Sequence, residues 1–304
     1  MKVEKLAENI RPQKGSNVQV KMTGNITEIR YMSIQPSAKI QKLDKDRYVM
    51  LETGEIKEFN HTEKRIENKT NIKQSIKRLR DLINTNVTNA KNCLWITLTY
   101  AENMQDKDRL YNDFRKFNMK LKYYIKAKHL PKYEYIVCAE PQKRGAWHFH
   151  LLLIFDEAAP FIHNDILAKT WGHGFTKTTA LKNVDNIGAY LSAYLADIEL
   201  TETDMHNLKN IKNNDLKTIT HNGESKAIIK GARLKLYPTG FRLYRTSRGI
   251  KQPIIENCTN YKAMKKVQNS TMTYEKTIQL IDDNNKIINT INYRHFNQLR
   301  NNGE

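Results

Sequence analysis

Apolar residues recur at helical spacing in several parts of this chain. In Asp108–Ala127 they would share one face, with lysines and arginines around the rest of the helix. The same period predicts helices over Thr62–Asn86 and Ile162–Trp171. The middle of the chain is therefore expected to contain at least three helices.

Other segments alternate apolar and polar side chains, or are rich in β-branched and aromatic residues, as strands are. They are Leu94–Tyr100, Tyr133–Cys138 and Ala146–Phe155, with shorter stretches at Gly24–Met32 and Asp46–Glu52. The turn-like Pro141–Gly145 joins two of these segments, so the sequence predicts a β-hairpin there.

The predicted hairpin carries a candidate set of metal ligands. Side chains on a strand alternate between its faces, so His148 and His150 would point to the same side. If the turn centres near Lys143, Glu140 lies opposite Trp147 or His148. Two imidazoles and a carboxylate would then converge on one point.

Two nitrogen ligands and one oxygen ligand suit Mn or Mg better than a structural zinc site, which usually has four ligands and thiolates. The alternative is that both histidines are ordinary residues on the polar face of a half-buried strand. However, the apolar run Leu151–Phe155 indicates a buried strand, where two imidazoles without partners would be costly.

A second candidate feature is a pair of tyrosines downstream of the hairpin. Val184–Glu199 has a helical period, and Tyr190 and Tyr194 are four residues apart, so both phenols would lie on one face. Taken alone, they could be amphipathic core residues. Beside a bound cation, however, a tyrosine can act as a nucleophile towards a phosphodiester and form a phosphotyrosine link.

Three motifs in this order resemble the HUH endonuclease superfamily, and more closely the rolling-circle replication initiators of bacterial plasmids and single-stranded-DNA phages. They are the strand W-I-T-L-T-Y (Trp95–Tyr100), the segment E-x-x-x-x-G-x-x-H-F-H (Glu140–His150) and the Y-L-S-A-Y-L helix that begins at Tyr190. In the relaxases of conjugation the tyrosine precedes the histidine pair, whereas here it follows.

The resemblance implies an α+β fold, with a central antiparallel sheet of the ferredoxin-like kind flanked by helices, and with N- and C-terminal extensions. It further implies a divalent metal, Mn or Mg, held by Glu140, His148 and His150. Tyr190 and Tyr194 would be the catalytic nucleophiles in nicking and strand transfer on single-stranded or hairpin origin DNA. Host helicase and polymerase would be the further partners.

Two alternatives remain open at this stage. One is a transposase or mobilisation relaxase of the same superfamily, and the other is a non-catalytic regulator that binds origin DNA. The regulator is suggested by a departure from the family pattern, since a lysine is usual three residues after a catalytic tyrosine. Here Ala193 and Asp197 occupy those positions, and Lys177 or Lys182 could supply the charge instead.

Composition agrees with a nucleic-acid partner. The chain has 51 Lys and Arg against 32 Asp and Glu, a net charge of +19, and this surplus would attract a phosphate backbone. A membrane-spanning run and a signal-peptide core are both lacking, so we expect a cytoplasmic protein in a bacterial host, without membrane contacts. No G-K dipeptide occurs, so no P-loop helicase is expected.

The sequence suggests three regions. These are an N-terminal region with a basic helix (1–88), an HUH endonuclease domain (89–205) and a basic C-terminal region (206–304). Within the last, Asn207–Ser225 is polar and is predicted to be a loop. Lys226–Gln252 is basic and interleaved with aromatics, which indicates either DNA contacts or a basic β-hairpin turning at Pro238. The predicted DNA-binding residues are Arg233, Arg242, Arg245, Arg248 and Lys251. The last forty residues carry no motif.

Overall fold

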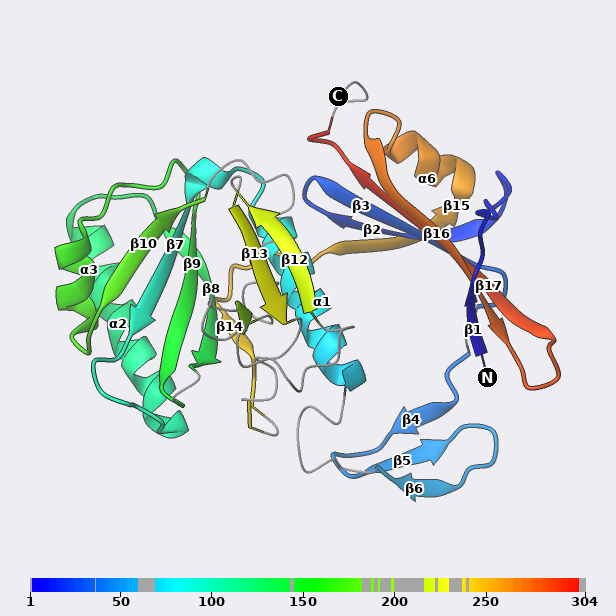
Figure 1. The fold of residues 1–304 in the computed structure, drawn as a ribbon, viewed down its shortest axis with the longest axis horizontal. Coiled ribbons are helices and arrows are strands. Elements are labelled where there is room, and N and C mark those ends of the chain that lie inside the picture. Colours follow the sequence, from blue (N-terminus) through cyan, green and yellow to red (C-terminus); the bar gives the residue numbers. More distant parts are fainter. Residues whose placement is uncertain are drawn as a thin grey trace. The chain divides into compact units, whose positions relative to one another are not determined.

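The computed structural model describes residues 2–35, 37–59, 69–142, 145–181, 187–188, 191, 198–199, 216–221, 224–229, 237–238 and 241–300. The chain forms two compact units, one of Lys64–Gln252 and one that joins Met1–Glu63 to Pro253–Glu304 (Figure 1). This grouping differs from the three consecutive regions suggested by the sequence, because strands from both ends of the chain pair in one sheet.

The unit of Lys64–Gln252 contains a five-stranded antiparallel sheet with the strand order β10-β7-β9-β8-β14. Its strands are β7 (Cys93–Thr99), β8 (Tyr133–Pro141), β9 (Trp147–Phe155), β10 (Thr176–Ala180) and β14 (Tyr244–Thr246). Central strand β9 is buried along almost its whole length. A smaller sheet in this unit contains β11 (Ile198–Glu199), β12 (Leu216–His221) and β13 (Glu224–Ile229).

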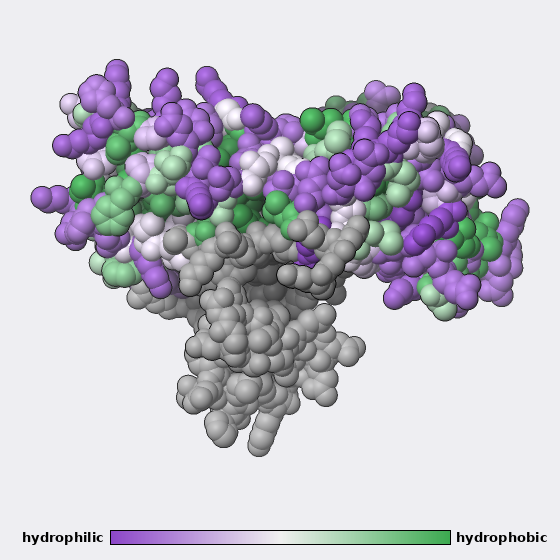
Figure 2. All heavy atoms as spheres, turned by 90° about the horizontal axis from the view of Figure 1, so that it is seen from above, coloured by the Kyte–Doolittle hydropathy of each residue, from purple (hydrophilic) through white to green (hydrophobic). Residues whose placement is uncertain are grey.

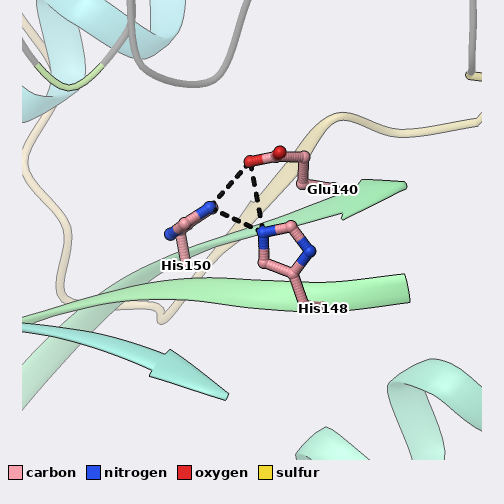
Figure 3. Close-up of side chains that lie close together, drawn as sticks. All are labelled: Glu140, His148 and His150. Atoms are coloured by element: carbon pink, nitrogen blue, oxygen red, sulfur yellow. Dashed lines mark hydrogen bonds and ion pairs between the residues drawn. The ribbon is translucent and has the colours of Figure 1, made fainter. Parts of the chain in front are cut away.

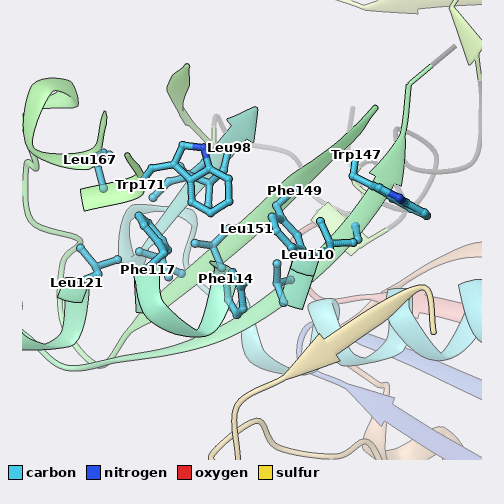
Figure 4. Packing of buried hydrophobic residues seen from close by; sticks show 14 of the residues in the cluster. Leu98, Leu110, Phe114, Phe117, Leu121, Trp147, Phe149, Leu151, Leu167 and Trp171 are labelled. Atoms are coloured by element: carbon cyan, nitrogen blue, oxygen red, sulfur yellow. The ribbon is translucent and has the colours of Figure 1, made fainter. Parts of the chain in front are cut away.

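Helices pack on both faces of the five-stranded sheet. Helices α2 (Lys107–Ala127) and α3 (Asn164–Trp171) pack on one face, where their apolar side chains meet those of β9, including Phe149 and Leu151 (Figure 4). Helix α1 (Lys69–Asn86) packs on the other face. Between α1 and β7 lies a short 3-10 turn, Ala90–Asn92. Since each face has its own apolar cluster, the sheet forms the middle layer of this unit.

The helix ends follow from local chemistry. Asp106 caps α2 by accepting hydrogen bonds from the backbone N–H groups of Asp108 and Arg109, which would otherwise have no partner within the helix. Helix α3 ends at Gly172, whose φ of 69° is easily adopted only by glycine. The indole of Trp171 then donates to the carbonyl of Thr99 at 2.9 Å, which attaches α3 to β7.

The second unit contains a six-stranded antiparallel sheet with the order β1-β16-β17-β3-β2-β15. Its elements are β1 (Lys2–Lys5), β2 (Asn17–Thr23), β3 (Ile26–Met32), β15 (Ile254–Thr259), α6 (Asn260–Lys266), β16 (Thr271–Ile281) and β17 (Ile287–Asn297). A small meander of β4 (Ile40–Lys42), β5 (Arg47–Met50) and β6 (Ile56–Glu58) also belongs to it. Helix α6 packs on the six-stranded sheet through Ala263 and Val267.

The α+β class and its antiparallel sheet are confirmed, as are the hairpin and the helices in the described parts of their predicted ranges. Two local predictions were wrong. Ile198 and Glu199, expected at the end of a helix, pair with β13, because these inter-strand hydrogen bonds override the helical period. Within the expected loop Asn207–Ser225, strand β12 pairs with β13.

The face of the molecule seen in Figure 2 is largely polar where residues are coloured. Figure 2 shows hydrophilic side chains projecting over much of the visible face, with hydrophobic residues in small groups between them. Among the helices described, none combines the length and the apolar character needed to cross a membrane.

Candidate metal centre

The β8–β9 hairpin determines which side chains meet. Residues pair in the register Glu140↔His148 and Cys138↔His150, so the sequence prediction that left Trp147 or His148 opposite Glu140 is resolved in favour of His148. Backbone hydrogen bonds from Gln142 to Ala146 and from Gly145 to Gln142 close the turn, and Gly145 has a φ of 88°. Cross-strand neighbours share a face, so this register brings the carboxylate and both imidazoles to one side of the sheet.

The three side chains converge closely (Figure 3). Glu140 Oε2 lies 2.7 Å from His150 Nε2 and 3.4 Å from His148 Nε2, and the two Nε2 atoms are 2.9 Å apart. All three residues are buried, with exposed fractions of 0% for Glu140, 7% for His148 and 3% for His150. This is a compact group of one oxygen and two nitrogen donor atoms that could hold a metal ion.

The charge states of these groups favour a cation. Burial lowers the pKa of His148 to about 4, and burial together with His148 holds the pKa of His150 well below its usual range. Both imidazoles are therefore neutral at neutral pH, which is the form that binds metals. Within the described residues, the buried Nδ1 of His148 has no hydrogen-bond partner. The donor set fits a divalent ion with open coordination positions.

Neighbouring strands hold His150 in place. The ring of Trp95 on β7 stacks on the His150 ring, with centroids 5.3 Å apart and planes 9° from parallel. Thr97, which pairs with His150 across the strands, brings its hydroxyl to 3.4 Å from Nδ1. Such contacts orient an imidazole and leave Nε2 for a ligand. Neither role was predicted from the sequence, although both residues lie in the W-I-T-L-T-Y strand.

Described residues that flank the predicted nucleophile Tyr190 pack on the same face of the sheet. Tyr190 and Tyr194 themselves lie outside the described residues. Ile187 and Leu191, the described residues on either side of Tyr190, are buried in an apolar cluster with residues of α1. The same cluster contains Trp95 and Cys138, which lie on the face of the sheet that bears His148 and His150. The candidate metal ligands, Ile187 and Leu191 therefore share one face of the sheet.

Gly188 attaches this segment to α1. Its backbone N–H donates to Asn84 Oδ1 at 2.8 Å. A Cβ atom at Gly188 would lie 2.5 Å from both the Arg80 carbonyl oxygen and Asn84 Oδ1, so only glycine fits this approach. The signal in the sequence was an isolated glycine inside a helical pattern, which often marks close packing. Nothing in the sequence indicated that Asn84 on α1 would be its partner.

Of the two lysines that could replace the motif lysine, the structure describes Lys177. Lys177 pairs with Thr97, which in turn pairs with His150, so Lys177 lies on the face of the sheet that bears the candidate metal ligands. Lys182 lies outside the described residues, as do the two positions where the family pattern has lysine, Ala193 and Asp197. Lys177 is exposed.

The predicted DNA-binding residues of the C-terminal region do not all lie on this face. Arg242, Arg245, Arg248 and Lys251 are exposed, and Arg233 lies outside the described residues. Arg245 pairs with Val137 and places its guanidinium 3.4 Å from the centre of the Tyr111 ring, on the α2 side of the sheet. DNA contacts by these residues remain a prediction.

Together, the fold and the site define an α+β unit with a buried carboxylate–histidine group, and Ile187 and Leu191 are buried on the same face of the sheet. Residues 93–199 match the family described as Replication-associated protein ORF2. The matched span contains all three candidate ligands and both tyrosines, and the match supports a role among replication initiators. No curated protein matches the chain.

Proposed function

We propose that this protein is a replication initiator of the HUH two-tyrosine type, which nicks single-stranded origin DNA and starts rolling-circle replication. The observation that carries this proposal is the convergence of a carboxylate and two imidazoles on the sheet face where Ile187 and Leu191, which flank Tyr190 in the sequence, are buried. The similarity of residues 93–199 to replication-associated proteins supports it.

In this proposal, Glu140, His148 and His150 hold a divalent ion, Mn or Mg. A bound ion would polarise the scissile phosphodiester and stabilise the charge that builds on its non-bridging oxygens. Trp95 and Thr97 keep the His150 ring in the orientation that leaves Nε2 for the ion.

The covalent step would be an exchange of one phosphodiester for another. The phenol oxygen of Tyr190 bonds to phosphorus while the bond between phosphorus and the 3′ oxygen breaks. The phenol loses one proton and the 3′ oxygen gains one, so a 3′-hydroxyl and a 5′-phosphotyrosine result. Since the link conserves the phosphodiester, Tyr194 can repeat the reaction before the strand is released.

The partners would be single-stranded or hairpin origin DNA, together with a host helicase and polymerase that extend the new 3′ end. The net charge of +19 favours association with this DNA. Binding is then expected to weaken steeply as salt rises, because each neutralised phosphate releases counterions.

The test is the formation of a covalent protein–DNA adduct with single-stranded origin DNA and Mn, followed by gel electrophoresis under denaturing conditions. Wild type is expected to form the adduct, and the Tyr190→Phe/Tyr194→Phe double variant to form none. Tyr123→Phe is the matched control, because Tyr123 is exposed on α2, which covers the other face of the sheet. An adduct that persists in the double variant would exclude these nucleophiles, and mass spectrometry identifies the tyrosine used.

A second candidate function is a regulator that binds origin DNA without cutting it. The replacement of the motif lysines by Ala193 and Asp197 favours it. The same experiment separates the two functions, since a regulator would retain sequence-specific DNA binding and form no adduct with Mn or Mg.

A further inference from the structure

Phe175, just before edge strand β10, and Lys177 within it are both exposed and lie on the face of the sheet that bears the candidate metal ligands. Lys177 pairs with Thr97, and the Phe175 carbonyl accepts a hydrogen bond from the Thr99 backbone N–H at 2.8 Å. Thr97 and Thr99 pair in turn with His150 and His148. Two cross-strand rows therefore run from β10 to the histidines.

Thr176, which lies between Phe175 and Lys177, confirms which way their side chains point. Thr176 points to the opposite side, where it is buried and its hydroxyl donates to Asn164 Oδ1 at 2.9 Å. Because successive side chains alternate, Phe175 and Lys177 share the face that bears the histidines. Neighbouring strands are ~4.8 Å apart, so β10 lies about 10 Å from β9, within the span of a dinucleotide.

The chemistry of these rows matches single-stranded nucleic acid. Phe175 is a large aromatic residue with 65% of its surface exposed, and Lys177 beside it is also exposed. The half-buried Thr97 and Thr99 add hydroxyl groups between them and the histidines. Strands β7, β9 and β10 contain no carboxylate that would repel a phosphate. An aromatic ring next to a cation is the usual combination for stacking a base and pairing with its phosphate.

We propose that Phe175 and Lys177 form a nucleotide subsite beside the metal centre. Phe175 stacks on an unpaired base next to the scissile phosphate, and the Lys177 ammonium pairs with the adjoining phosphate. The subsite rests on the proposed action on single-stranded DNA, and it names the residues that select a strand with exposed bases. A duplex is excluded from it, because paired bases are covered by their neighbours and offer no face to the ring.

The subsite can be tested by binding alone. A short fluorescein-labelled oligothymidylate is titrated with the full chain in EDTA, and anisotropy is followed at several salt concentrations. Phe175→Ala is expected to weaken binding about five- to tenfold at every salt concentration, the lower end of the effect of losing one stacked base. Phe175→Tyr, which keeps a ring, is expected to bind like wild type. Lys177→Ala is expected to reduce the salt slope by about 0.7, the value for one phosphate on a single strand.

Matched controls come from the same unit. Phe161→Ala removes an 88% exposed phenylalanine before α3, and Lys120→Ala removes an exposed lysine on α2. Both are expected to bind like wild type. Wild-type-like binding by Phe175→Ala, an equal loss in Phe161→Ala, equal competition by duplex DNA, or no binding by the wild type would each overturn the subsite.

This outcome is independent of the nicking reaction, because no cleavage is required in EDTA. Phe175-dependent binding without a covalent adduct in Mn would support the subsite and reject the nickase. An adduct in Mn with unchanged binding by Phe175→Ala would do the reverse.

Discussion

Gly188→Ala tests how the tyrosine segment is held against the rest of its unit. The added methyl group would lie 2.5 Å from the Arg80 carbonyl oxygen and from Asn84 Oδ1. The carbonyl oxygen belongs to helix backbone and cannot move away cheaply. The segment must therefore shift, which also breaks the 2.8 Å hydrogen bond from Gly188 to Asn84.

The expected loss follows from these contacts. The hydrogen bond contributes about 1 kcal/mol, and forcing a methyl group into packed structure costs ~1–3 kcal/mol. If the shift also exposes Ile187 and Leu191, each fully exposed side chain adds ~1.5–3 kcal/mol. We expect the free energy of unfolding to fall by roughly 2–4 kcal/mol, or the Tm by about 5–15 °C in a unit of this size.

Thermal unfolding and adduct formation would both be measured. Gly15→Ala is the matched control, because nothing lies within 4 Å of its added methyl group, and its stability should change by less than ~1 kcal/mol. Adding Asn84→Ala to Gly188→Ala should not restore stability, because the Arg80 carbonyl remains. If Gly188→Ala has the same Tm as the wild type and forms as much adduct, Gly188 does not pack against α1 in this way.

Two further predictions concern metal binding and pH. Mn is expected to stabilise the wild type by ~2.7 kcal/mol when it exceeds its dissociation constant about a hundredfold. This shift should be lost in Glu140→Gln and kept in Glu157→Gln, an exposed control, and equal shifts would argue against the site. Burial raises the pKa of Tyr111 from 10.0 to about 12, so the folded protein keeps a proton that the unfolded chain loses. The free energy of unfolding should thus be unaffected by this group below about pH 10 and should fall above it by ~1.4 kcal/mol per pH unit. Urea unfolding of Tyr111→Phe at several pH values should show a smaller slope than the wild type.

The convergence of the two histidines could be predicted because strand alternation is a local property. His148 and His150 had to share a face once the segment was recognised as a strand. The residue opposite Glu140 could not be predicted, since the register depends on a turn closed by Gly145 at positive φ. The contact between Gly188 and Asn84 joins residues 104 positions apart, and no local pattern indicates such a pairing.

The last two strands show why part of the fold was not predicted. Strands β16 and β17 bury polar side chains, which break the apolar alternation that marks a strand. Asn292 donates to Thr277 Oγ1 at 3.1 Å, and Arg294 donates to Asn260 Oδ1 at 2.7 Å. These hydrogen bonds join residues 15 and 34 positions apart, so the burial of Asn292 and Arg294 could not be inferred from the sequence.

The six-stranded sheet combines strands from two distant parts of the sequence, and this affects how the protein folds during synthesis. Strand β17 lies between β16 and β3, so the hairpin β2–β3 has a bare strand edge until the ribosome has made more than 250 further residues. At roughly 5–20 residues per second, the ribosome takes on the order of ten seconds or more to supply that strand. Lys64–Gln252 is complete earlier, so the unit with the metal ligands can fold co-translationally. The six-stranded sheet closes only after β17 has been made, and its exposed edge in the nascent chain is where chaperones should act.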